Sequence, residues 1–296
     1  MKVGKTSMSA SFPRNLILAT EVGYHAIAGI HAVDIDGWTT FKRYLKELEK
    51  DSVKDKFDTV TIDTVSLLWD LCEKFICLQN DVTTIGDIPY GKGYDLCKKE
   101  FGESLRKITL LGYGLVLICH SDIRIEKDDE GNEVEFVAPA LNKRAYAIAN
   151  QIVDIIGYIS IDFNKDGTSA RKIYTRQTPR IMAGSRFQYL PAEIPFGYTE
   201  LANALADAIE QSGKRDGAVI VDNRIMPVAN SRSFSETMEE ARALFEQLPD
   251  APEVNDRLTK SIKENFGSET FPLSSAKESQ QDLVEAVIAD MKAMLK

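Results

Sequence analysis

The residues closest to a known chemical motif stand at the start of the chain, where Gly4, Lys5, Thr6 and Ser7 follow one another. Gly-Lys-Thr is the second half of the phosphate-binding loop, in which backbone N–H groups surround the phosphates, the lysine reaches the β- and γ-phosphates and the hydroxyl binds Mg²⁺. We therefore expect Gly4, Lys5, Thr6 and Ser7 to bind ATP, with Thr6 as a Mg²⁺ ligand. The motif's first glycine and the strand before it would fall ahead of Met1, so this strand is expected to be missing or to lie upstream.

Two apolar runs downstream end in carboxylates that suit a nucleotide site. Residues 16–20 precede Glu21, and residues 57–62 precede Asp63. Short apolar runs bounded by polar residues are typical of buried parallel strands, whose carboxyl ends meet at the ligand-binding edge of a sheet. Glu21 can activate the water that attacks a γ-phosphate, and Asp63 can hold Mg²⁺ opposite Thr6. A solvated acid at a strand end is the alternative for Glu21.

A third apolar run, residues 114–119, ends in His120, which can hydrogen-bond the γ-phosphate or relay its presence to the segment that follows. A histidine satisfied structurally at a strand end is the alternative interpretation.

The elements around these runs predict an α/β fold with a mostly parallel sheet flanked by helices. Apolar residues at helical spacing predict helices in the body and in the C-terminal part of the chain. Those of the body are residues 38–50, 65–79, 96–111, 143–153 and 195–211, and those of the C-terminal part are 235–248, 253–265 and 276–295. Further strands are expected at 155–162 and 171–175, joined by a turn at 164–167.

Two stretches have side chains suited to nucleic acid or to a neighbouring subunit. Residues 80–94 are expected to be irregular, and they place Tyr90, Lys92 and Tyr94 among glycines, as a single-strand-binding loop requires. Tyrosines packed on the domain surface are the alternative. A second cluster can bind DNA phosphates or complete a neighbouring ATP site, with a solvated surface as its alternative. Its members are Arg176, Arg180 and Arg186.

Composition divides the chain into a body and a tail. Residues 233–296 hold 13 acidic and 7 basic residues, a net charge of −6, whereas residues 1–232 hold 32 and 29, a net charge of −3. The near-neutral body can still carry a local basic groove. We predict an ATPase core over 1–211, a linker over 212–232 and an acidic helical appendage over 233–296.

Cellular context follows from what the sequence lacks. No apolar run approaches the ~20 residues of a membrane span, and the start of the chain does not read as a signal peptide, so we expect a cytoplasmic protein with no membrane partner. Cys72, Cys77, Cys97 and Cys119 have neither metal-binding nor redox spacing, which favours reduced, mostly buried thiols.

In the order of these motifs, residues 1–205 resemble the RecA-type core of phage and prophage ATPases that act with single-strand annealing systems. The resemblance implies that Glu21 is the catalytic glutamate, that His120 replaces a sensor glutamine and that ATP lies between subunits of a homo-oligomer. It also implies that the loops after the second and third apolar runs bind single-stranded DNA, which adds Arg124 and Lys143 to the DNA-binding candidates. A phage single-strand-binding or annealing protein is then a possible partner.

Other functions stay open at this point. A scaffold that keeps the fold without turnover is favoured by the shortened phosphate loop. A P-loop kinase would need a lid and an acceptor pocket, neither of which the sequence shows, and a DnaB-like helicase core shares the same motifs.

Overall fold

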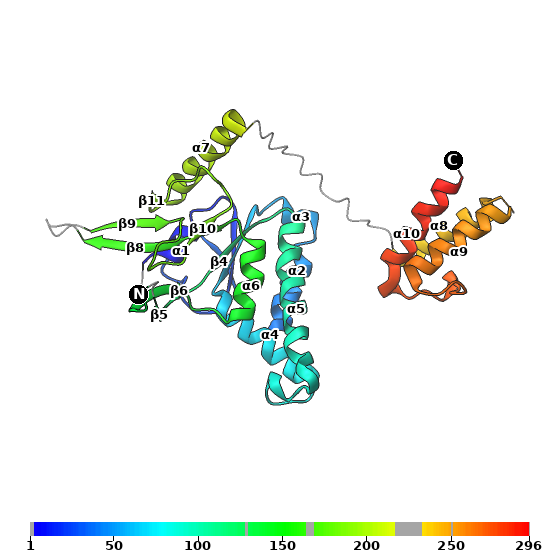
Figure 1. The fold of residues 1–296 in the computed structure, drawn as a ribbon, viewed down its shortest axis with the longest axis horizontal. Helices are drawn as coiled ribbons and strands as arrows, with labels where there is room; N and C mark the ends of the chain where they lie inside the picture. The colour runs from blue at the N-terminus through cyan, green and yellow to red at the C-terminus, as the bar shows by residue number, and fades with distance from the viewer. Residues whose placement is uncertain (1–2, 128–129, 164–168, 217–232, 250, 296) are drawn as a thin grey trace. The chain divides into compact units, whose positions relative to one another are not determined.

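The structure, a computed structural model, describes residues 3–127, 130–163, 169–216, 233–249 and 251–295. The chain divides into two compact units, Met1–Met226 and Pro227–Lys296 (Figure 1). Each unit has its own hydrophobic core.

The first unit is built on a parallel sheet of four strands in the order β2-β1-β3-β4. The strands are β1 (Asn15–Ala19), β2 (His31–Asp34), β3 (Thr59–Asp63) and β4 (Gly114–Ile118). The register places Leu18 beside Ile62 and Ile62 beside Leu117, so the three apolar runs of the sequence end level with one another. The predicted α/β class with a parallel sheet is confirmed.

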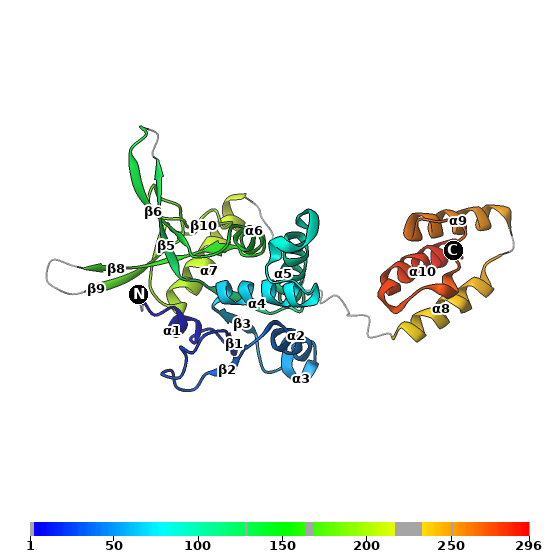
Figure 2. The same cartoon turned by 90° about the horizontal axis from the view of Figure 1, so that it is seen from below.

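β1 and β3 are buried along their whole length because both faces of the sheet are covered. On one face, alternate side chains pack into the main core with Trp38, Trp69 and Phe101. These rings meet with centroids 6.0 Å (Trp38–Phe101) and 5.1 Å (Trp69–Phe101) apart. The helices of this layer are α2 (Trp38–Glu47), α3 (Asp51–Lys54), α4 (Val65–Gln79), α5 (Lys92–Leu110) and α6 (Lys143–Ile152), seen in Figures 1 and 2.

The short helix α1 (Lys5–Ser9) is fastened to the sheet by the buried Asn15. The Asn15 amide donates to the Ser9 carbonyl over 2.7 Å and accepts from the Thr61 hydroxyl over 3.1 Å. Because a buried amide is costly unless it is hydrogen-bonded, these contacts fix α1 against β1 and β3.

The rest of the first unit consists of two β-hairpins and a long helix. β5 (Ser121–Lys127) pairs with β6 (Glu133–Pro139), and β8 (Tyr158–Phe163) pairs with β9 (Ser169–Tyr174), which also pairs with β11 (Glu193–Pro195). Figure 2 shows both hairpins reaching out from the body. α7 (Tyr198–Asp216) shares a core with β9 and β11, and β7 (Ile155–Ile156) pairs with β10 (Gly184–Ser185).

Several element boundaries differ from the prediction. α5 begins at Lys92, so Tyr94 lies in its first turn; the preceding stretch holds η1 (Ile85–Asp87) and η2 (Pro89–Gly91). α7 runs to Asp216 and includes five residues that were predicted as linker. The single strand predicted over 155–162 is divided into β7 and β8 at Gly157. The predicted turn at 164–167 and linker residues 217–232 lie outside the described residues.

The second unit is a bundle of three helices around Val284, Val287, Ile288 and Met291. The helices are α8 (Phe234–Gln247), α9 (Pro252–Phe266) and α10 (Gln281–Met294), with the short turns η3 (Leu273–Ser275) and η4 (Glu278–Gln280) before the last. The predicted C-terminal helices are therefore present. In neither unit do the described residues include a helix long and apolar enough to span a bilayer. The four cysteines are free thiols.

Candidate active site

The centre of the site is a hydrogen bond between the two residues predicted to hold Mg²⁺. The Thr6 hydroxyl donates to Asp63 Oδ2 over 2.7 Å, joining α1 to the end of β3 across 57 residues of sequence. Asp63 is only 5% exposed. Gly4, immediately before α1, has φ of 95°, a left-handed conformation that glycine adopts without strain.

Thr20 connects the ends of β1 and β3 through hydrogen bonds that the sequence did not predict. Its hydroxyl donates to the Thr64 carbonyl over 3.0 Å and accepts from the Thr64 N–H over 2.8 Å. Its own N–H donates to the Asp63 carbonyl over 2.8 Å. Glu21 follows directly, so these hydrogen bonds hold its backbone beside the end of β3.

Glu21 and His120 follow β1 and β4, the strands on either side of β3, and their side chains contact each other at the carboxyl edge of the sheet. His120 Nε2 lies 3.3 Å from Glu21 Oε1, and both side chains are partly open to solvent. The His120 carbonyl accepts from the Ala140 N–H over 2.7 Å, which closes the root of the β5–β6 hairpin. The predicted sensor therefore joins the predicted base to a projecting hairpin.

Burial and charge act against each other at this site. Desolvation raises the pKa of Asp63, the neighbouring Glu21 carboxylate raises it further, and the Thr6 hydroxyl and the positive charge of Lys5 oppose the rise. Burial also raises the pKa of the Cys119 thiol to about 11. Cys119 is consequently a neutral thiol at neutral pH.

The oxygen donors of Thr6 and Asp63 fit Mg²⁺ bound to a nucleoside triphosphate. A hydroxyl and a carboxylate oxygen are hard ligands that Mg²⁺ accepts beside phosphate oxygens and water. Thr6 and Asp63 are the residues that would hold the ion, and Lys5 lies close enough to alter the pKa of Asp63. No cluster of three or more acidic, histidine or cysteine ligands occurs within the described residues.

The DNA-binding candidates lie in two neighbouring regions. Tyr90 is 96% exposed, and its φ of 60° is unusual for a bulky residue. Tyr94 packs against Arg144, whose guanidinium carbon lies 3.9 Å from the ring centroid. This contact brings the start of α5, with the exposed Lys92, to the start of α6.

Arg124 and Lys143 line a small hollow beside Arg144. The hollow has a volume of about 90 Å³, and its other lining residues are Pro139, Leu141, Tyr146 and Met182. Arg124 Nη2 donates to the Pro139 carbonyl over 3.3 Å. The structure thus brings both predicted cations together, and it adds Arg144 and Tyr146, which the sequence analysis had not singled out.

The three candidate trans-acting arginines have different surroundings. Arg176 donates to the backbone carbonyls of Phe187 and Gln188, over 2.7 Å and 2.6 Å. Arg186 pairs with Asp154 over 3.0 Å. Within the described residues, the exposed Arg180 guanidinium has no hydrogen-bond or ion-pair partner.

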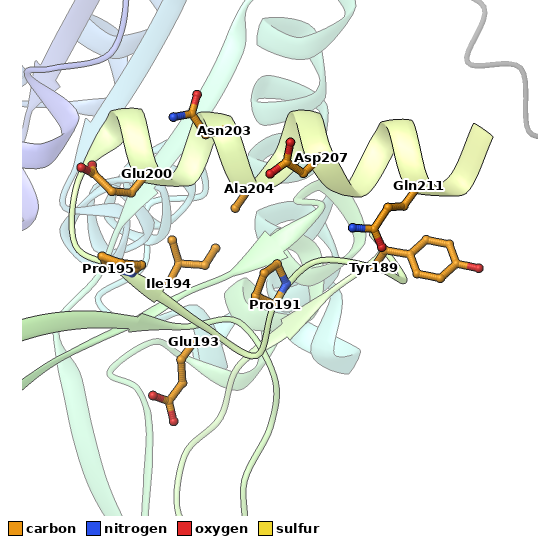
Figure 3. A pocket seen from close by; sticks show the side chains of 10 residues that line it. All are labelled: Tyr189, Pro191, Glu193, Ile194, Pro195, Glu200, Asn203, Ala204, Asp207 and Gln211. Atoms are coloured by element: carbon orange, nitrogen blue, oxygen red, sulfur yellow. The ribbon is translucent and has the colours of Figure 1, made fainter. Parts of the chain in front are cut away.

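A larger hollow of about 330 Å³ lies between β11 and α7 (Figure 3). Carboxylates of Glu193, Glu200 and Asp207 line it. Glu200 lies against Gly197, where an added Cβ would come within 1.9 Å of Glu200 Oε2. Three carboxylates would repel a triphosphate, so this hollow is not the nucleotide site.

Comparison with known protein families finds a match over the first part of the chain. Residues 1–187 match the AAA domain family, and this stretch contains the phosphate loop, Glu21, Asp63 and His120. The chain belongs to the AAA domain family. A nucleotide-binding P-loop domain on a parallel sheet is what this family membership implies.

This AAA domain protein also has a relative of phage origin. It is 25% identical over 304 residues to the SPbeta prophage-derived uncharacterized protein YorG of Bacillus subtilis (strain 168). The alignment covers 99% of this chain and 90% of that protein. Both units of the AAA domain protein are therefore included in the similarity.

Proposed function

We propose that this chain is a Mg²⁺-dependent ATPase of RecA type that acts with single-stranded DNA in phage recombination or repair, in the cytoplasm of the host cell. The observation that carries the proposal is the 2.7 Å hydrogen bond between Thr6 and Asp63, with Glu21 and His120 in contact at the same edge of the sheet. The prophage-derived relative supports the phage setting.

Each residue has a distinct role in this proposal. Lys5 neutralises phosphate charge, while Thr6 and Asp63 hold Mg²⁺, which when bound offsets the charge that develops on the phosphates. Glu21 orients the attacking water and accepts its proton. His120 reports the presence of the γ-phosphate to the β5–β6 hairpin, because its carbonyl closes the root of that hairpin.

DNA binding is assigned to the exposed loop and the basic hollow next to it. Tyr90 offers a free ring for stacking, and Lys92, Arg124, Lys143 and Arg144 offer charge for the backbone. We take Tyr94 to be a supporting residue, since its ring is already covered by Arg144.

ATP hydrolysis with Mg²⁺, measured with and without single-stranded DNA, tests the proposal. The wild-type chain should hydrolyse ATP faster when DNA is present, and Lys5→Ala should abolish turnover because the lysine's phosphate contacts are lost. Lys98→Ala, which removes an exposed lysine on α5, serves as the control and should behave as wild type. Normal turnover by the Lys5 variant would contradict the assignment of the phosphate loop.

A catalytically impaired ATP-binding scaffold or accessory module of a phage replication or recombination complex is the second candidate. It is favoured by the contact between Glu21 and His120, which occupies one oxygen of the proposed base. ATP binding without hydrolysis, unchanged in Glu21→Gln, would support this candidate over the ATPase.

A further inference from the structure

Arg171, a residue of β9, lies against the phosphate loop although it is far from it in sequence. Arg171 Nη1 donates to the Val3 carbonyl over 3.3 Å. A Cβ at Gly4 would lie 2.5 Å from the same nitrogen, so the guanidinium occupies the space beside that glycine. The arginine therefore touches the turn that precedes Lys5.

The guanidinium is held in a fixed plane by Phe196. Its carbon lies 4.1 Å from the centroid of the Phe196 ring, and the Phe196 N–H donates to the Arg171 carbonyl over 3.1 Å. Stacking of this kind orients an arginine and leaves its edge free to donate. One contact to Val3 uses one of five N–H donors.

Among the described residues, no carboxylate balances the charge of Arg171. Arg171 forms no ion pair with any described residue, whereas the adjacent Lys172 pairs with both Asp162 (3.0 Å) and Glu193 (3.1 Å). Two neighbouring cations of one strand thus differ: Lys172 is paired within the sheet, whereas Arg171 points at the phosphate loop and has no anionic partner in the part of the chain that the structure describes. An uncompensated cation beside Gly4 and Lys5 matches a polyphosphate.

We propose that Arg171 is a second phosphate-binding cation of this site, acting within the same chain, and that it anchors the phosphate loop to the β8–β9 hairpin. This inference rests on the proposed ATP site and adds a ligand contact that the motif does not contain. The remaining N–H donors of the guanidinium bind phosphate oxygens while its contact with Val3 holds the loop.

The test is Mg²⁺–ATP binding by calorimetry at several salt concentrations, with circular dichroism melting to confirm folding. Arg171→Gln removes the charge and keeps a polar side chain, but its amide nitrogen ends two bonds short of the arginine Nη1 that donates to Val3. The salt dependence of affinity therefore separates loss of charge from loss of this contact. Arg171→Gln should weaken ATP binding by about tenfold or more, as loss of a charged hydrogen bond does, and should reduce the salt dependence of affinity. Arg171→Lys should keep most of that salt dependence. Lys172→Ala is the matched control and should bind ATP as wild type does.

The outcomes separate this inference from the proposed function. If the wild-type chain does not bind ATP, the proposed function and the role of Arg171 both fail. If the wild type binds ATP, Lys5→Ala does not, and Arg171→Gln matches wild type in affinity and salt dependence, only the role of Arg171 is overturned. A loss of affinity in Arg171→Gln with unchanged salt dependence would also overturn it, because that result indicates a structural effect on the loop alone.

Discussion

Burial of Asp63, the proposed Mg²⁺ ligand, is expected to lower the stability of the ligand-free protein. The Asp63 carboxylate is buried, which raises its pKa, so its ionised form at neutral pH costs folding free energy when no cation is present. We expect Asp63→Asn to raise the melting temperature of the ligand-free protein and to abolish Mg²⁺-dependent ATP binding. The amide can still accept from Thr6, so the fold should be kept.

The pH dependence of the melting temperature tests whether the buried charge of Asp63 causes this loss of stability. A raised pKa in the folded state means that folding favours the protonated acid, so the penalty is complete at neutral pH and is relieved as the pH falls through that pKa. The melting temperatures of the wild type and Asp63→Asn should therefore converge as the pH falls through the raised pKa toward the ordinary pKa of an aspartate. A constant difference at every pH would show that desolvation of the charge is not the reason.

The loop between α4 and α5 contains Tyr90, through which the proposed DNA binding can be tested. Tyr90 is held in a left-handed conformation and is almost fully exposed, so its ring contributes little to the core. Tyr90→Ala should weaken single-stranded DNA binding by about 1–3 kcal/mol, as loss of one base stack does, with little change in melting temperature. Fluorescence anisotropy with a labelled oligonucleotide measures this.

Tyr24→Phe is a suitable control for Tyr90→Ala. Tyr24 lies in a different loop, and its hydroxyl donates a hydrogen bond to Asp34 at the end of β2. Equal affinity for DNA in the wild type and Tyr90→Ala would remove this loop from the DNA interface.

The elements that were predictable are those with a local physical signal. β1, β3 and β4 are continuous apolar runs between polar residues, and that pattern alone indicates buried parallel strands. The end of an apolar run also located Glu21, Asp63 and His120. Their contacts with one another followed from the rule that parallel strands end at one edge.

Other parts of the site could not be read from the sequence because their signal is tertiary. Arg171 lies 168 residues from Val3, and its exposure on β9 gives no local sign of a partner. Thr20 is an ordinary strand-end residue until its hydroxyl is seen to bond Thr64. The start of α5 was misplaced because Gly91 and Gly93 resemble loop residues, although Gly93 is buried against Ile88 at the first turn.

The proposed assembly of several chains can be tested through Arg180. We propose a homo-oligomer in which Arg180, the candidate arginine with an uncommitted guanidinium among the described residues, acts on the ATP of a neighbouring chain. Lys5→Ala and Arg180→Ala proteins should each be inactive, and mixing them should restore part of the turnover, since one supplies the arginine and the other an intact phosphate site. No recovery from a mixture shown by light scattering to form mixed oligomers would contradict this arrangement.

The division into two units separates charge as well as structure. The second unit has its own apolar core of Val284, Val287, Ile288 and Met291, and most of the chain's net negative charge lies in residues 233–296. An acidic helical bundle repels the phosphates of nucleic acid and so disfavours binding to it. If the proposed DNA binding holds, we therefore expect its interface in the first unit.

The position of β4 at the edge of its sheet has a consequence for handling the protein. Its apolar residues 115–117 are half-buried, and the strand contains neither a charged residue nor a proline. Proteins usually guard such an edge with lysine, proline or a bulge, because its unpaired N–H and C=O groups can accept a strand from another molecule. Aggregation through intermolecular strand pairing is therefore expected to begin at β4, and a lysine introduced in that strand would be the first change to make when a concentrated sample is needed.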